Sequence, residues 1–233
     1  MTRANRTRYL IKDREQSPIA EAYRALVFSI QQEQAGRDIR SLLFVGAADG
    51  EGTAMVALNT ATSLAYSGKK VVLVDCDLRK PILHEVFYLD NIGMTNIISE
   101  GRAWADVLQL TDVVNLKLLA GGSMMPRPIE NLANPKVQEV LAGLREIADC
   151  VVVNSSPILF RDNYVWSDAC VLASKVDGVV LVLDSRKVKA AHAKKVLELL
   201  NGAKASLLGT VLNDVKRDTD LAYYISSDTE TNR

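Results

Sequence analysis

"SLLFVGAADGEGTAMVALNTATSLAYSGKKVVLVD" spans residues 41–75 and contains the pattern that decides the fold. Apolar runs at 41–45 and 69–75 predict two strands, and the segment between them predicts a helix that ends at Ser67 and Gly68. A short glycine-rich turn joins the first strand to this helix. Because neither apolar run alternates with polar residues, both strands should belong to a parallel sheet that is covered on both faces.

The same alternation of strands and helices continues along the chain. Ser17 and Asn134 each precede a proline, which is typical of an N-cap followed by the first helical position. Further strands are predicted at 116–122, 149–154, 177–184 and 205–214, helices at 17–34, 134–148, 167–175 and 189–203, and short helical pieces around 84–88 and 95–100. The pattern predicts an α/β fold with one domain at 17–215, a basic arm at 1–16 and a polar tail at 216–233.

Composition excludes several classes of protein. Lysine plus arginine and aspartate plus glutamate both number 28, so the chain has no overall charge to attract nucleic acid. The basic arm is interpreted as a solvated segment, with contact to a membrane surface or an acidic partner as the alternative. No apolar run approaches the roughly 18 residues that span a bilayer, and the N-terminus lacks a signal-peptide core. We therefore expect a cytoplasmic protein that reaches a membrane only through a partner.

The cysteines indicate a reducing compartment. The chain has three of them, Cys76, Cys150 and Cys170, and two lie in apolar strand-like runs. An odd number in such positions argues against a disulfide framework. We expect them to be buried as small apolar side chains.

Several motifs together resemble one family. They are "SPIAEAYRAL" (17–26), "VVLVDCDLRKPILHEVF" (71–87), "MPRPIENL" (125–132) and "DGVVLVLDSRKVK" (177–189). These residues resemble the bacterial tyrosine kinases of capsule and exopolysaccharide operons, which belong to the MinD/ParA-like group of P-loop ATPases. The resemblance covers about 17–215 and implies a three-layer P-loop fold that binds ATP with Mg²⁺.

The glycine-rich turn departs from the family pattern. A working phosphate loop needs a lysine for the phosphates and a hydroxyl for Mg²⁺, and the family version reads G-E-G-K-[ST]. Here Gly50, Glu51 and Gly52 are followed by Thr53 and Ala54, and a one-residue shift supplies no lysine either. The turn is interpreted as a phosphate loop that has lost its chemistry, with a plain strand–helix turn as the alternative.

The motif "DCDLRKP" is intact, but the strand at 149–154 departs from the family pattern. The resemblance assigns metal and general-base roles to Asp75 and Asp77, with Arg79 beside them, and a capped turn is the alternative. The strand at 149–154 should end in aspartate and ends in Asn154, which carries no charge for the metal. Thr53, Ala54 and Asn154 therefore differ from the family pattern. In that pattern, the groups at these three positions serve one Mg²⁺–ATP.

Nucleotide binding is a separate expectation. Asn213 resembles the family's adenine-reading asparagine at the end of the last strand, and a strand-end cap is the alternative. We expect weak binding of ATP or ADP through residues 50–54, or a cavity that its own side chains fill.

The resemblance also carries expectations about assembly. The family's first helix bears E-x-x-R-x-x-R, which joins subunits, and here Glu21 and Arg24 are followed by Val27. The tyrosine cluster of the family's tail is reduced to Tyr223 and Tyr224, as phosphoacceptors or as incidental tail residues. Expected partners are a membrane adaptor of the polysaccharide co-polymerase type, an active kinase relative or further copies of the chain.

Three functional hypotheses follow. The first is a catalytically inactive kinase-like protein that regulates or scaffolds polysaccharide production. The second is an atypical active tyrosine kinase or ATPase, which would use Asp75, Asp77 and Arg79 with a substitute cation. The third is a MinD/ParA-like positioning protein, which the helix and the "MPRPIENL" motif disfavour.

Overall fold

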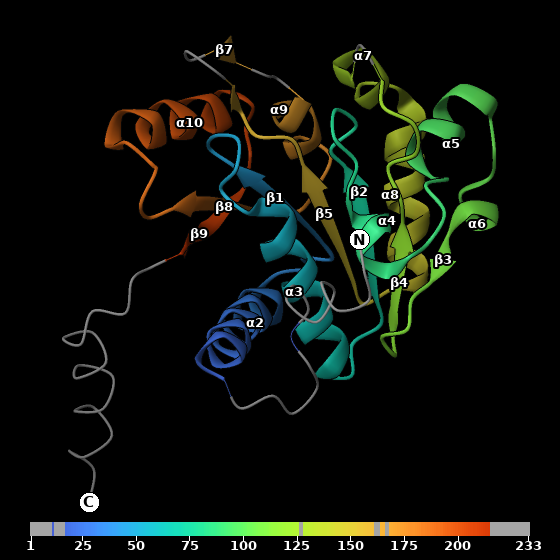
Figure 1. Ribbon diagram of the computed structural model, residues 1–233, viewed down its shortest axis with the longest axis horizontal. Coiled ribbons are helices and arrows are strands. Elements are labelled where there is room, and N and C mark those ends of the chain that lie inside the picture. The colour runs from blue at the N-terminus through green and yellow to red at the C-terminus, as the bar shows by residue number, and fades with distance from the viewer. Residues whose placement is uncertain (1–10, 12–16, 126–127, 161–163, 166–167, 215–233) are drawn as a thin grey trace, which may run out of the picture.

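A central sheet organises the computed structural model, which describes residues 11, 17–125, 128–160, 164–165 and 168–214. Its strands lie in the order β3-β4-β2-β5-β1-β8-β9, and every pairing is parallel except that of β3 with β4 (Figure 1). The strands are β1 (Ser41–Gly46), β2 (Val71–Cys76), β3 (Gln109–Leu110), β4 (Leu116–Leu119), β5 (Cys150–Ser155), β8 (Gly178–Asp184) and β9 (Leu207–Asn213). The predicted α/β fold with a mostly parallel sheet is confirmed.

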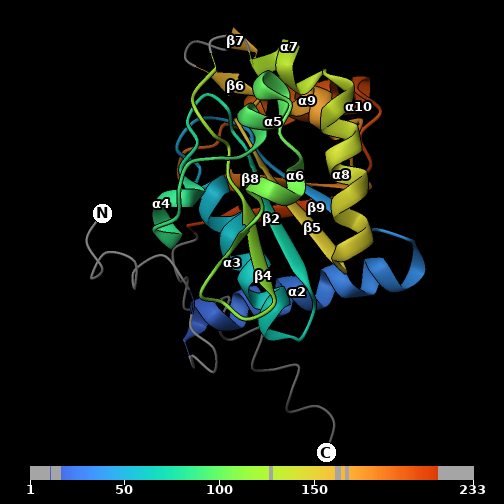
Figure 2. The same ribbon diagram turned by 90° about the vertical axis from the view of Figure 1, so that its right-hand side faces the viewer.

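Helices cover both faces of this sheet (Figures 1 and 2). One face packs against α2 (Pro18–Gly36), α3 (Thr53–Tyr66) and α4 (Leu83–Phe87). The other packs against α5 (Met94–Glu100), α6 (Trp104–Val107), α7 (Pro128–Leu132), α8 (Pro135–Ile147), α9 (Asp168–Ala173) and α10 (Ala190–Gly202). Along β1, Leu42 and Phe44 enter the first core whereas Leu43 and Val45 enter the second, because side chains alternate along a strand. The structure thus has the three layers that were predicted.

Local sequence signals explain where the main helices begin. Ser17 accepts a hydrogen bond from the Ala20 N–H at 3.1 Å, and Asn134 accepts one from the Lys136 N–H at 3.0 Å. Both predicted N-caps are confirmed, each with a proline at the first helical turn. Cys76 and Cys150 are buried free thiols, and Cys170 is partly buried.

Short elements were not predicted. They are α6, α7, β3 and an antiparallel pair, β6 (Leu159–Phe160) with β7 (Tyr164–Val165). Such short segments have too few residues to show a period, and long-range contacts hold them in place.

The last strand also differs from expectation. Its run of apolar residues suggested burial on both faces, but β9 lies at the edge of the sheet and is mostly exposed, with Leu212 at 58%. Helix α2 packs on the face of the sheet that also carries α3, but it does not cover β9. An apolar groove therefore lies between α2 and β9. Within the described ranges, no helix is both long and apolar enough to cross a bilayer.

Candidate active site

The carboxyl ends of β1, β2 and β5 meet around a cavity of about 170 Å³. Ligands of open parallel sheets bind at this edge, where the loops after the strands converge. The cavity is lined by Ala48, Asp49, Gly50, Glu51, Gly52, Thr53, Ala54, Asp77, Lys80, Ile82, Asn154, Ser155 and Pro157. The structure therefore brings together the phosphate loop, one aspartate of the "DCD" motif and Asn154, as the order of motifs predicted.

The glycine-rich turn has the backbone shape of an anion-binding loop. Gly50 and Gly52 have φ angles of 78° and 79°, a left-handed conformation that glycine adopts without a steric penalty. Helix α3 begins directly after Gly52, without a side-chain cap and without an acidic residue in its first turn. The first amide groups of α3 thus retain the partial positive charge of a helix N-terminus at the cavity.

Glu51 turns its carboxyl group into the loop instead of toward solvent. The residue is 2% exposed, and its Oε2 accepts a hydrogen bond from the Ala48 N–H at 3.0 Å. Burial raises the pKa of this carboxyl above its ordinary value. Its Oε1 has no partner among the described residues.

Two side chains from the C-terminal half hold the loop from outside. The Lys187 Nζ donates to the Gly50 carbonyl at 2.7 Å and lies 3.2 Å from the Asp184 Oδ2. The Asn213 Nδ2 donates to the Glu51 carbonyl at 2.9 Å. Asn213 is therefore in contact with the loop, as its predicted nucleotide role requires, although the role in reading adenine stays a prediction. No sequence signal pointed to Lys187, because 137 residues separate it from Gly50.

Asp75 is enclosed and fully hydrogen-bonded. It is 0% exposed, its Oδ1 accepts from the Asp77 N–H and the Asn154 Nδ2, and its Oδ2 accepts from the Ile82 and Leu83 N–H groups. These distances run from 2.9 to 3.2 Å. Burial raises the pKa of the Asp75 carboxyl. Its predicted metal and base roles stay predictions, because this carboxylate does not line the cavity and its contacts shape the turn that follows β2.

Asn154 lies beside Asp75 because the two residues are paired across β5 and β2. The Asn154 Nδ2 donates to the Asp75 Oδ1 at 3.0 Å, so its amide serves the buried carboxylate. The Asn154 Oδ1 is buried, has no partner in the described part of the chain and belongs to a residue that lines the cavity.

Asp77 lines the cavity, and the pKa of its carboxyl group is raised. Its Oδ1 accepts from the N–H groups of Arg79 and Lys80 at 3.3 and 3.1 Å. Burial, and then the negative charge of Asp75, raise the pKa of Asp77 to about 7. A carboxyl group with this pKa can take up and release a proton near neutral pH.

Arg79 is paired with a buried carboxylate, and its predicted catalytic role stays a prediction. Its Nε and Nη2 donate to the Oδ2 and Oδ1 of Asp168 at 2.6 and 3.3 Å, and Asp168 is 1% exposed. Ser156 also donates to the Asp168 Oδ2, at 3.2 Å. Arg79 thus joins the turn after β2 to α9 and does not line the cavity.

The cavity fits a phosphate group better than it fits a metal held by protein ligands. The uncapped α3 amides and the unpartnered Asn154 Oδ1 are polar groups that a bound, hydrated phosphate would satisfy. Among the described residues, no cluster of three or more histidine, cysteine, aspartate or glutamate side chains could hold a metal. Mg²⁺ binds through one or two carboxylates together with substrate phosphates, and Asp77 is the aspartate of the motif that is placed for this.

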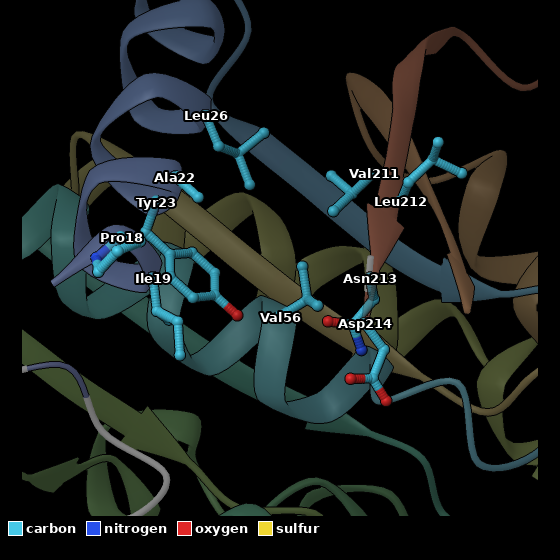
Figure 3. Close-up of a pocket in the computed structure, with 10 residues that line it drawn as sticks. All are labelled: Pro18, Ile19, Ala22, Tyr23, Leu26, Val56, Val211, Leu212, Asn213 and Asp214. Atoms are coloured by element: carbon cyan, nitrogen blue, oxygen red, sulfur yellow. The ribbon is translucent and has the colours of Figure 1, made fainter. Parts of the chain in front are cut away.

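The groove between α2 and β9 lies next to the phosphate loop and has a volume of about 530 Å³. Figure 3 shows side chains from α2 on one side and from β9 on the other, with Val56 of α3 between them. Asn213 stands at one end of the groove and also contacts the loop. The groove is mainly apolar, so its chemistry suits an aromatic ring or an apolar side chain.

The predicted assembly residues are only partly described. Glu21 and Arg24 form an ion pair on the exposed face of α2. Val27, which stands at the third position of the family motif, is 5% exposed and packs in the core. The arm at 1–10 and 12–16 and the tail tyrosines Tyr223 and Tyr224 lie outside the described residues.

Comparison with known proteins identifies relatives along nearly the whole chain. No family model matches. The chain is 33% identical over 215 residues to the putative tyrosine-protein kinase CapB of Staphylococcus aureus. The matched region covers 92% of this chain and 92% of that protein. It is 32% identical over 212 residues to the tyrosine-protein kinase YwqD of Bacillus subtilis. This match covers 90% of this chain and 87% of that protein.

Solved structures show the same fold. The chimerical protein CapA2B2 matches with a TM-score of 0.80 at 27% identity, covering 88% of each chain. The septum site-determining protein MinD of Pyrococcus horikoshii, solved with Mg-ADP, matches with a TM-score of 0.61 at 23% identity, covering 77% of this chain and 72% of that one. The second likeness concerns the fold alone.

Proposed function

This chain belongs to the family of bacterial tyrosine-protein kinases, and we propose that it is a member without phosphoryl transfer that acts by binding a partner. The observation that carries this proposal is the lining of the loop cavity. Thr53, Ala54 and Asn154 lie together there, at the positions where the family pattern has a lysine, a hydroxyl and a carboxylate. One Mg²⁺–ATP would need all three groups.

The chemistry explains why these changes should abolish transfer. Most of the catalysis in phosphoryl transfer comes from positioned charges that stabilise the transferring group. Removing one such group typically costs about 10²–10³ in rate. The Asn154 amide also donates to Asp75, so the position that would support the metal is neutral and already engaged.

We propose that the remaining pocket binds ATP or ADP weakly. Phosphates would lie at the amide groups that begin α3, and the base would lie toward Asn213 and the apolar groove. Such binding would stabilise the fold for partner recognition, because a ligand that binds only the folded state adds to its stability.

The proposed place of action is the production or export of exopolysaccharide or capsule. The partner would be a membrane adaptor of the polysaccharide co-polymerase type or an active kinase relative, and it would bring a cytoplasmic protein to the membrane. Homo-oligomers through α2 are a further proposal, supported by the exposed Glu21–Arg24 pair. The domain that does this would be 17–215, between a basic arm and a tail.

A second candidate function is an atypical active tyrosine kinase. Asp77 favours it, because this residue lines the cavity and its pKa of about 7 suits a general base. A third candidate, a MinD/ParA-like positioning protein, is supported only by likeness of fold.

Labelled ATP with Mg²⁺ distinguishes the first two candidates. We expect no label on tyrosine and no phosphate release above an Asp77→Asn variant, either alone or with an active relative. The triple variant Thr53→Lys, Ala54→Ser, Asn154→Asp is the matched positive control and should bind ATP more tightly. Transfer by the unchanged chain that Asp77→Asn abolishes would overturn the proposal in favour of the active kinase.

A further inference from the structure

The cavity lacks a lysine from its own loop but receives one from another segment. Lys80, which follows β2, lines the same cavity as Gly50–Ala54. Of the described residues that line this cavity, no other is a lysine or an arginine.

The backbone around Lys80 is fixed while its side chain is exposed. The Lys80 N–H donates to the Asp77 Oδ1 and to the Asp77 carbonyl, both at 3.1 Å. Just after it, the Ile82 and Leu83 N–H groups donate to Asp75 at 2.9 and 3.0 Å. Within the described part of the chain, the Lys80 side chain forms no ion pair. The turn therefore presents an ammonium group that is free to meet an anion.

Nearby cations are engaged or distant. Lys187 contacts the Gly50 carbonyl and the Asp184 carboxylate and does not line the cavity. Arg79 is bound to Asp168. Lys69 follows the C-terminal end of α3, about 20 Å from the loop at 1.5 Å per residue.

Across the cavity lie groups that suit a phosphate. Helix α3 has 14 residues, and its first amides are uncapped. Independently, the Asn154 Oδ1 is a buried acceptor without a partner in the described chain. A hydrated phosphate bound at the cavity would supply a donor to this oxygen and accept hydrogen bonds from the amides.

We infer that Lys80 takes the place of the missing loop lysine and binds the terminal phosphate of a nucleoside diphosphate. Asp75 and Asp77 are then positioning residues, because their carboxylates hold the turn that carries Lys80. Asp49 and Asp77 also line the cavity and oppose an anion, so the binding should be weak. This inference rests on the weak nucleotide binding proposed above.

Calorimetric titration with ADP tests the inference, with adenosine as a probe that lacks phosphate. Lys80→Met should weaken ADP binding about tenfold or more, since hydrogen bonds to charged groups are strong, and leave adenosine binding within about twofold. Lys69→Met removes the same charge from the far end of α3 and should leave both affinities unchanged. Lys80→Arg should retain most of the ADP affinity. Thermal unfolding of each variant checks that it is folded.

Two results would overturn the inference: no ADP binding by the unchanged chain at millimolar concentration, or equal ADP binding by Lys80→Met. Either result would leave the proposal of an inactive kinase relative intact, because that proposal depends on the transfer assay. Conversely, phosphate transfer would overturn that proposal and leave the assignment of Lys80 in place.

Discussion

The phosphate loop (46–54) and the turn after β2 (75–83) face each other across one cavity but are held in different ways. The turn is held by its own carboxylates, since Asp75 and Asp77 accept hydrogen bonds from its backbone. The loop has one such internal contact, from the Ala48 N–H to Glu51, and is otherwise held from outside by Lys187 and Asn213. The difference teaches that the aspartates of the turn shape its backbone, whatever part they take in a reaction.

The largest expected effect is at the base of the turn. Asp75→Ala removes the acceptor for three backbone N–H groups and the Asn154 amide, in two buried and two partly buried hydrogen bonds. Because each unsatisfied buried donor is costly, we expect the free energy of unfolding to fall by about 4 kcal/mol or more. Urea unfolding followed by circular dichroism measures this. Asp75→Asn keeps one acceptor oxygen, so its free energy of unfolding should fall clearly less. Equal losses in the two variants would contradict the claim that this carboxylate holds the turn.

The next effect concerns the anchor of the turn to α9. Arg79→Met leaves the 1% exposed Asp168 carboxylate without its cation, which should cost about 3 kcal/mol. The control is Arg102→Met, which removes an exposed partner of Glu100 and should leave the urea midpoint unchanged. A small effect of Arg79→Met would mean that the hydrogen bonds of the turn suffice without this anchor.

The pH dependence of stability sharpens the comparison further. The pKa of Asp77 is about 7 in the folded chain and near 3.9 when unfolded, so between these values the folded state binds more protons. The contribution of Asp77 to stability should therefore fall as pH rises from 5 to 7, by at most about 1.4 kcal/mol per pH unit. Urea midpoints across this range should show a flatter profile for Asp77→Asn. An unchanged slope in Asp77→Asn would contradict the raised pKa of Asp77, and the raised pKa values of Asp75 and Glu51 would then account for the profile.

The smallest effect is expected in the loop. Lys187→Met removes one hydrogen bond to the Gly50 carbonyl and one of two cations near the Asp184 carboxylate, which keeps Arg186 at 3.7 Å, so the loss of global stability should be smaller than that of Arg79→Met. Amide hydrogen exchange at residues 47–53 should become about fivefold faster, which corresponds to one modest hydrogen bond. A loss of global stability as large as that of Arg79→Met would erase the distinction between the two regions.

The sequence predicted the strands and the long helices because their apolar runs, caps and prolines are local signals. It also predicted that Thr53, Asp77 and Asn154 would meet, since the carboxyl ends of parallel strands converge. It did not predict the Arg79–Asp168 pair or the Lys187 contact, whose partners are 89 and 137 residues apart. It did not predict the four hydrogen bonds that engage Asp75, because a motif shows which residues are present but not how they are bonded, and the metal and base roles of Asp75 stay predictions.

The pairing of Asn154 with Asp75 has a consequence for how substitutions in the cavity combine. An aspartate at 154 would place a second carboxylate about where the amide now donates, 3.0 Å from the Asp75 Oδ1. Without a cation in the loop, two buried carboxylates at this distance repel each other. Asn154→Asp alone should thus be harmful and become tolerable only after a lysine returns at 53. The effect of a carboxylate at 154 should therefore depend on the residue at 53, so the two positions act as one coupled unit.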